Sequence, residues 1–110
     1  MKRQIKKQTW IAKYLTKILK IRERRALRMC RNVKDSNIKE IRKSTPDKNR
    51  LKDAFNITVV TNTHKMIPVQ ILLRWPNQTS RPKSNYLVIN NNSKQEHVER
   101  QIKKITAGAV

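Results

Sequence analysis

The strongest constraint on the fold is a long N-terminal stretch without a helix breaker. Residues 2–33 contain neither Pro nor Gly, the two residues that most often interrupt regular structure. Apolar residues recur there every three or four positions, and basic residues do the same on the opposite side of a helical wheel. The sequence therefore predicts one long basic amphipathic helix.

The two sides of this expected helix differ sharply in chemistry. The apolar side holds Ile11, Leu15, Ile18, Leu19, Ala26, Met29, Cys30 and Val33. The basic side holds Lys2, Lys6, Lys13, Lys17, Lys20, Arg24, Arg28 and Arg31. No acid falls among those basic positions, whereas a solvated helix face normally mixes both signs, so the pattern favours binding of a polyanion. Arg22 interrupts the apolar side, which predicts a bend there or pairing of Arg22 with an acid.

Two shorter helices are expected next. Asp35 or Ser36 could cap a helix over residues 37–43. Thr45-Pro46-Asp47 then reads as a break followed by a new helix start, with Pro46 at the first helical position. That second helix is expected to end near Phe55.

The second half of the chain favours strands. Ile57–Thr61 and Met66–Trp75 are predicted strands, joined by a turn at Asn62–Lys65 into an antiparallel hairpin. Tyr86–Ile89 is a predicted third strand. The residues Ser93-Lys94-Gln95-Glu96 match a capping box, which predicts a closing helix.

We therefore expect an α+β fold. It combines the long N-terminal basic helix, short helices, a small three-stranded antiparallel sheet and a C-terminal helix. Residues 1–44 are interpreted as a basic helical arm and residues 45–110 as a small α+β domain.

The net charge limits how such a chain can exist alone. Lys and Arg number 27 against 7 acids, which gives a formal charge of +20, and only 36% of the 110 residues are hydrophobic. Self-repulsion of this size destabilises a compact state, and few apolar residues are present to oppose it. We expect partial disorder until a polyanionic partner binds.

Residues typical of catalysis or metal binding do not occur in a recognisable pattern. The sequence has no Gly-rich phosphate loop and no Ser or Cys set beside a His, so neither an enzyme nor a cofactor is expected. His64 and His97 are interpreted as ordinary surface residues, and Cys30 as a small buried hydrophobic residue. A membrane span is not expected because no apolar stretch approaches 18 residues. The first helix could also lie on an anionic membrane with Trp10, Ile11, Tyr14 and Leu15 inserted, but we do not prefer this interpretation. The acid-free, basic N-terminus is also compatible with a mitochondrial targeting helix.

A second candidate contact follows the second expected strand. It consists of Arg74, Trp75, Arg81 and Lys83. An aromatic ring beside an arginine can stack on an unpaired base. The alternative, which we prefer from the sequence, is that Trp75 closes the core at the end of a strand.

The leading hypothesis is a non-catalytic, structural RNA-binding protein of a ribosome or another large ribonucleoprotein. It would contact RNA, most plausibly rRNA, and neighbouring proteins, in a cytoplasmic or mitochondrial particle. The composition resembles that of ribosomal proteins as a class, without a motif that identifies one. An interaction protein for an acidic protein surface, such as a microtubule or filament, is the first alternative. A recently arisen small protein without a settled partner is the second, because Gly108 is the only glycine.

Overall fold

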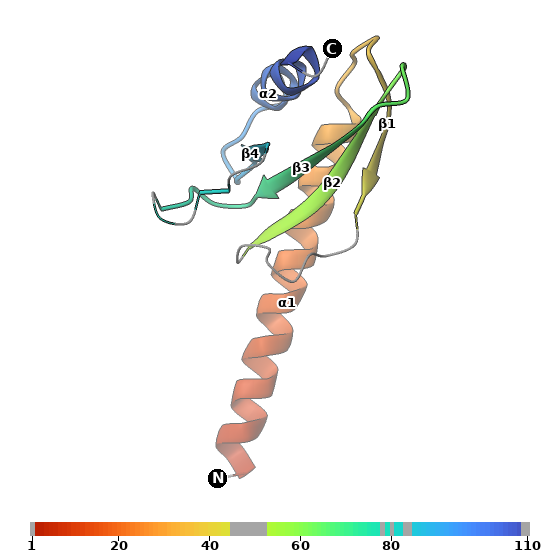
Figure 1. The fold of residues 1–110 in the computed structure, drawn as a ribbon. Coiled ribbons are helices and arrows are strands. Elements are labelled where there is room, and N and C mark those ends of the chain that lie inside the picture. The colour runs from red at the N-terminus through yellow and green to blue at the C-terminus, as the bar shows by residue number, and fades with distance from the viewer. Residues whose placement is uncertain (1, 45–52, 78, 80, 83–84, 109–110) are drawn as a thin grey trace.

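The computed structural model describes residues 2–44, 53–77, 79, 81–82 and 85–108, with side chains from Ala12 onward. The fold is α+β (Figure 1). Its elements in chain order are α1 (Lys2–Arg31), β1 (Ile38–Lys43), β2 (Ala54–Thr61), β3 (Met66–Leu72), β4 (Tyr86–Val88) and α2 (Gln95–Gly108). Expectations for residues 45–52, including the helix start at Thr45-Pro46-Asp47, lie outside the described residues.

The sheet has the strand order β1-β2-β3-β4. The predicted hairpin is confirmed: β2 and β3 pair antiparallel, with Phe55 opposite Ile71 and Val60 opposite Met66. His64 adopts a left-handed φ of 65° in the turn between them. The predicted three-stranded antiparallel sheet is wrong in two respects. The observed sheet has four strands, and β4 pairs parallel to β3. The long connection between residues 72 and 86 allows the chain to return before β4 begins.

The predicted helix over residues 37–43 is wrong, since these residues contain the edge strand β1. A register shift between Ile38 and Glu40 interrupts its pairing with β2. Such a bulge inserts one residue, so two side chains three positions apart can face the same side of the sheet. Ile38 and Ile41 both pack in the main core, and their spacing of three imitates a helix in the sequence.

Two expected boundaries also differ from the structure. The helix expected to reach Phe55 does not do so, because Ala54 and Phe55 are already in β2. The second strand ends at Leu72 instead of Trp75. Both residues at the start of β2 are buried, so the alternation that identifies a half-buried strand is missing there.

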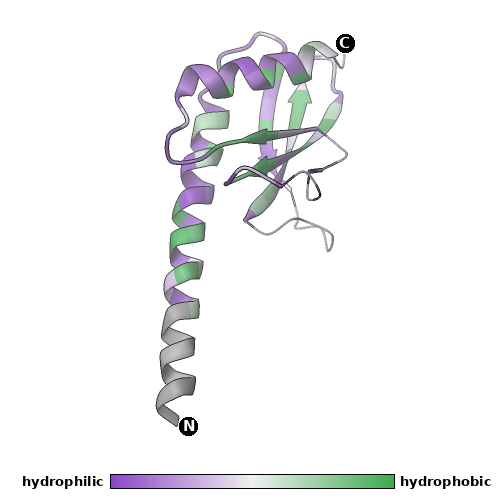
Figure 2. Ribbon diagram, turned by 90° about the vertical axis from the view of Figure 1, so that its left-hand side faces the viewer, coloured by the Kyte–Doolittle hydropathy of each residue, from purple (hydrophilic) through white to green (hydrophobic). Residues whose placement is uncertain are grey.

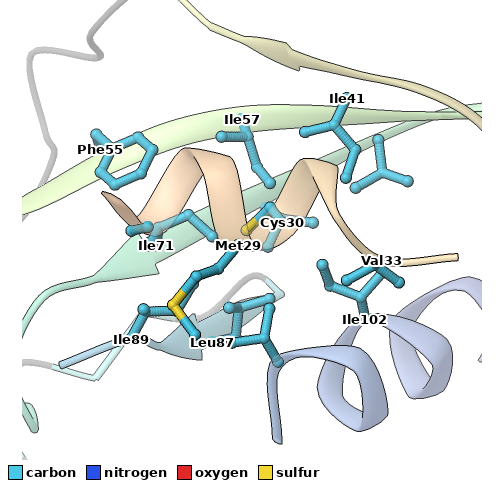
Figure 3. Packing of buried hydrophobic residues seen from close by; sticks show 14 of the residues in the cluster. Met29, Cys30, Val33, Ile41, Phe55, Ile57, Ile71, Leu87, Ile89 and Ile102 are labelled. Carbon is cyan, nitrogen blue, oxygen red and sulfur yellow. The ribbon is translucent and has the colours of Figure 1, made fainter. Parts of the chain in front are cut away.

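The core lies between the sheet and the two helices. One face of β2 and β3 packs against the C-terminal part of α1. Residues of α2 and Leu87 of β4 complete the same core on the side of α1 away from β2 (Figure 3). Cys30 is fully buried in this cluster, which confirms its expected role. The largest fully buried side chains are Phe55, Ile57, Ile71, Leu87, Ile102, Val59, Val98, Thr106 and Cys30. Burying a side chain such as Ile or Leu contributes roughly 1.5–3 kcal/mol.

The first helix belongs to this core only near its C-terminal end. Ala26, Met29 and Cys30 are buried, so the core contains residues from both sides of the proposed boundary at residue 44. The N-terminal half projects past the sheet (Figures 1 and 2). The molecule therefore measures 57 × 26 × 24 Å with a radius of gyration of 16.0 Å, above the roughly 13 Å of a compact domain of about 100 residues. The helix continues through Arg22, which is exposed.

Hydrogen bonds fix α1 to the segment that opens α2. Arg25 donates from Nη1 to the carbonyl oxygen of Asn90 at 3.0 Å and from Nη2 to that of Ser93 at 3.4 Å. Gln95 donates from Nε2 to the carbonyl oxygen of Met29 at 2.8 Å. The closing helix is confirmed, but its expected capping box is not. Ser93 Oγ accepts from the Asn90 backbone N–H at 2.9 Å and donates to Asn90 Oδ1 at 3.3 Å, so it stabilises the preceding turn.

Candidate nucleic-acid interface

Six cations predicted to form one basic side of the first helix are placed there by the structure. We call Lys13, Lys17, Lys20, Arg24, Arg28 and Arg31 the basic arc; all six side chains are exposed. They lie on the side of α1 opposite Ala26, Met29 and Cys30, which face the core. In Figure 2 the strands and α2 lie to one side of α1. The side chains of Lys2 and Lys6, which we expected in the same row, lie outside the described residues.

The cations of the arc are evenly spaced because the helical repeat sets the distance between them. Its members follow one another at steps of three or four residues, so each helical turn of about 5.4 Å carries one cation. From Lys13 to Arg31 the row extends over about 27 Å at 1.5 Å per residue. A hollow of about 400 Å³ is lined by Ala12, Lys13, Thr16, Lys17 and Lys20. Three of the arc lysines therefore border one common space.

Carboxylates of the described residues neutralise cations elsewhere. Four ion pairs are present: Glu23–Lys43 at 3.4 Å, Glu40–Arg42 at 3.0 Å, Asp53–Arg74 at 3.3 Å and Glu99–Lys103 at 3.8 Å. The hydrogen bond from Arg42 lowers the pKa of Glu40. No member of the arc forms an ion pair within the described part of the chain.

The carboxylate of Asp35 is also engaged in hydrogen bonds within the fold. Its carboxylate accepts a hydrogen bond from the backbone N–H of Asn37 at 2.9 Å and from Thr106 Oγ1 at 3.4 Å. Arg31 is the arc member with a hydrogen bond to the fold, since its Nε donates to the carbonyl oxygen of Ile41 at 3.4 Å. This contact satisfies one donor, and the Arg31 charge also contributes, after those of Arg42 and Lys39, to the lowered pKa of Glu40.

The second predicted group is not joined to the arc. Trp75 is 73% exposed, so the preferred interpretation that it closes the core is wrong. Arg74 beside it is exposed and paired with Asp53, and Arg81 is exposed in the same loop. Lys83 lies outside the described residues. This loop follows β3 and leaves the sheet on the β4 side (Figure 1), whereas the arc faces away from the sheet.

Further cations lie on α2. Arg100, Lys103 and Lys104 are exposed, and Lys103 shares its charge with Glu99. His64 and His97 are exposed, as expected. Within the described residues, no group of three or more His, Cys, Asp or Glu side chains could hold a metal ion. No helix of that part of the chain combines the length and apolar character needed to cross a bilayer.

Sequence reasoning missed two features of α1. Arg25 reads as one more surface cation, yet it binds the turn before α2; the sequence shows no signal for a partner 65 residues away. Leu15 was assigned to the core side of the helix, but it is 54% exposed. Periodicity gives the direction of a side chain, but not how far the sheet extends along the helix.

No protein-family model, curated protein or solved structure matches this chain at a significant level.

Proposed function

We propose that this protein is a non-catalytic RNA-binding protein that contacts phosphates through the basic arc of α1. The observation that carries the proposal is the row of six exposed cations on the outer side of one helix, none of which forms an ion pair with a described carboxylate. With 20 positive charges in excess on 110 residues, a structural component of a ribosome or another large ribonucleoprotein, cytoplasmic or mitochondrial, is the role that fits this surface best.

The binding energy in this proposal comes from counterion release. Nucleic acids condense cations around their closely spaced phosphates, and each Lys or Arg that replaces them returns those ions to solution. A helix presents its cations together and at fixed spacing, so one docking event can engage the whole row. Phosphate contacts of this kind position a protein without reading base sequence. We therefore expect recognition of RNA shape, with little dependence on base sequence.

The same charge explains why a partner would stabilise the fold. Neutralising the arc removes repulsion along α1, whose projecting half has no sheet beneath it. We expect this half of the helix to be more ordered in the complex than in the free chain.

Filter binding to structured RNA across a salt series tests the proposal. Six phosphate contacts predict that the logarithm of the association constant falls with the logarithm of salt concentration with a slope of about −4 to −5. An affinity that stays unchanged between about 50 and 200 mM salt would contradict phosphate contacts.

Nuclease treatment separates RNA from an acidic protein surface as the native partner. The protein is recovered from its native source with its associated material, and the sample is divided before digestion. Loss of the associated proteins after RNase treatment is expected if RNA mediates assembly. Retention of an acidic protein after complete digestion would favour the alternative, an interaction protein for such a surface.

A further inference from the structure

A short apolar row lies on the projecting half of α1, beside the basic arc. It consists of Tyr14, Leu15, Ile18 and Ile21, and we call it the apolar stripe. Tyr14, Leu15 and Ile21 are 54%, 54% and 57% exposed, and Ile18 is half-buried. Figure 2 shows this part of α1 alternating between hydrophobic and hydrophilic residues beyond the sheet.

The stripe faces a different direction from the arc. Tyr14, Ile18 and Ile21 follow one another at steps of four and three residues, which places them on one side of the helix. At about 100° per residue this side is rotated by roughly 90° from the middle of the arc. RNA bound along the arc would therefore leave the stripe uncovered. Single exposed apolar residues are ordinary, but four within two turns indicate an interaction surface.

The length of the stripe indicates the shape of its partner. Residues 14–21 extend over about 12 Å along the helix axis, which is close to the 10–12 Å diameter of one α-helix with its side chains. Arg22, which is exposed, ends the apolar row toward the sheet. A single helix crossing α1 would cover the stripe by ordinary ridge-and-groove packing.

The charges around the stripe indicate the chemistry of that helix. Arg22, which is not part of the arc, is exposed at the end of the stripe nearest the sheet and forms no ion pair with the described carboxylates. Arg25, next toward the sheet, donates to carbonyl oxygens and keeps its charge uncompensated. A second copy of this chain would bring a net charge of +20 next to another of +20. Repulsion between these charges disfavours self-association.

We propose that the apolar stripe docks an acidic amphipathic helix of a neighbouring protein. Apolar side chains of that helix cover Tyr14, Leu15 and Ile21, while its acids pair with Arg22, which lies outside the arc. This surface is separate from the arc, so the protein can bind RNA and a protein helix at the same time.

A designed peptide pair tests the proposal with the full chain. One fluorescent peptide of about 18 residues carries leucines on one helical side between glutamates. The second has the same composition in an order that scatters the leucines. Fluorescence anisotropy is expected to show at least tenfold tighter binding of the amphipathic peptide. The variant Tyr14→Gln, Leu15→Gln, Ile21→Gln is expected to lose this preference, whereas Met66→Gln, at an exposed apolar residue of β3, keeps it.

Glutamine is chosen because it favours helix nearly as well as leucine, and circular dichroism of the variants checks that α1 persists. RNA affinity of the stripe variant should stay within about threefold of the unaltered chain, because the arc is intact. Equal binding of the two peptides, or an unchanged preference in the stripe variant, overturns the proposal. Stripe-dependent dimers in sedimentation, or stripe-dependent binding to phosphatidylserine vesicles in place of the peptide, would also overturn it.

Discussion

Arg24 and Arg25 are neighbours in the sequence, but the helix turns their side chains about 100° apart. Arg24 is exposed in the basic arc, whereas Arg25 donates two hydrogen bonds to the turn before α2. Two residues of the same type therefore have separate structural and binding roles in this account.

Single alanine substitutions should separate those two roles. Arg25→Ala is expected to lower the free energy of unfolding by about 1–2 kcal/mol, because charged hydrogen bonds to buried or half-buried carbonyls are lost. Arg24→Ala is expected to change it by less than about 0.5 kcal/mol and to weaken RNA binding. Thermal unfolding and filter binding of both variants check this. The same stability for the two variants would contradict the role assigned to Arg25.

Cys30 gives a second test at the residue scale. Burial raises the pKa of its thiol from 9.0 to about 12. The reactive thiolate is therefore almost absent at pH 8 while the chain is folded, and a thiol reagent should label Cys30 only after denaturant is added. Because the folded pKa is raised, this group's contribution to stability is complete below pH 9.0 and is lost as the pH rises toward 12. Rapid labelling of the folded chain at pH 8 would show that the core opens at α1.

Trp75 is exposed, so it can be replaced without damage to the core. Trp75→Ala is expected to change the free energy of unfolding by less than about 0.5 kcal/mol. If its ring stacks on an unpaired base, the substitution should weaken binding of RNA with single-stranded loops by about 1–3 kcal/mol. Binding of a perfect duplex should change little. Equal effects on both RNAs would remove the stacking role.

At the scale of the elements, periodicity predicted what local sequence determines. The uninterrupted α1, the hairpin of β2 and β3, and the helix after Ser93 all appear where spacing and β-branched residues indicated them. The strand β1 was missed because the bulge between Ile38 and Glu40 gave it helical spacing. Ladder direction was missed for β4, since a long connection leaves both directions open to the chain.

In the candidate site, too, one part could be predicted from local sequence and another part depends on tertiary structure. The exposed arc follows from sequence because all of its members are on one helix and helical spacing fixes their common direction. Tertiary packing determines the rest: Lys43 is neutralised by Glu23 of α1, and Arg74 by Asp53, which directly precedes β2. Those pairings join residues about 20 positions apart, where sequence spacing carries no information about contact. The fold therefore decides which of the 27 cations remain uncompensated.

At the scale of the whole molecule, the ion pairs of the described residues lie in the folded body. Near the sheet, carboxylates pair with Lys43, Arg42 and Arg74. Most of the described ion pairs are therefore close to the sheet. The projecting half of α1 carries the apolar stripe and arc lysines that form no ion pair with a described carboxylate. The molecule therefore resembles a small folded body with one long arm that is suited to a partner of opposite charge.

Two charge-matched variants test the central claim most directly. The first reverses Lys13, Lys17, Lys20 and Arg24 of the arc to Glu. The second reverses Lys34, Lys39, Lys94 and Lys104, which are exposed, lie outside the arc and form no ion pair within the described residues. Both lower the net charge equally, so bulk electrostatics cannot distinguish them.

Filter binding of the two variants to the same structured RNA, over the same salt series, is the measurement. The arc variant is expected to bind at least about a hundredfold more weakly, with the salt slope reduced from about −5 to about −2, because four of six phosphate contacts are lost. The control variant is expected to keep the slope and to lose less than about tenfold, since scattered charges are screened beyond about 8–10 Å. Equal losses in the two variants would mean that total charge alone binds RNA, which would contradict the arc.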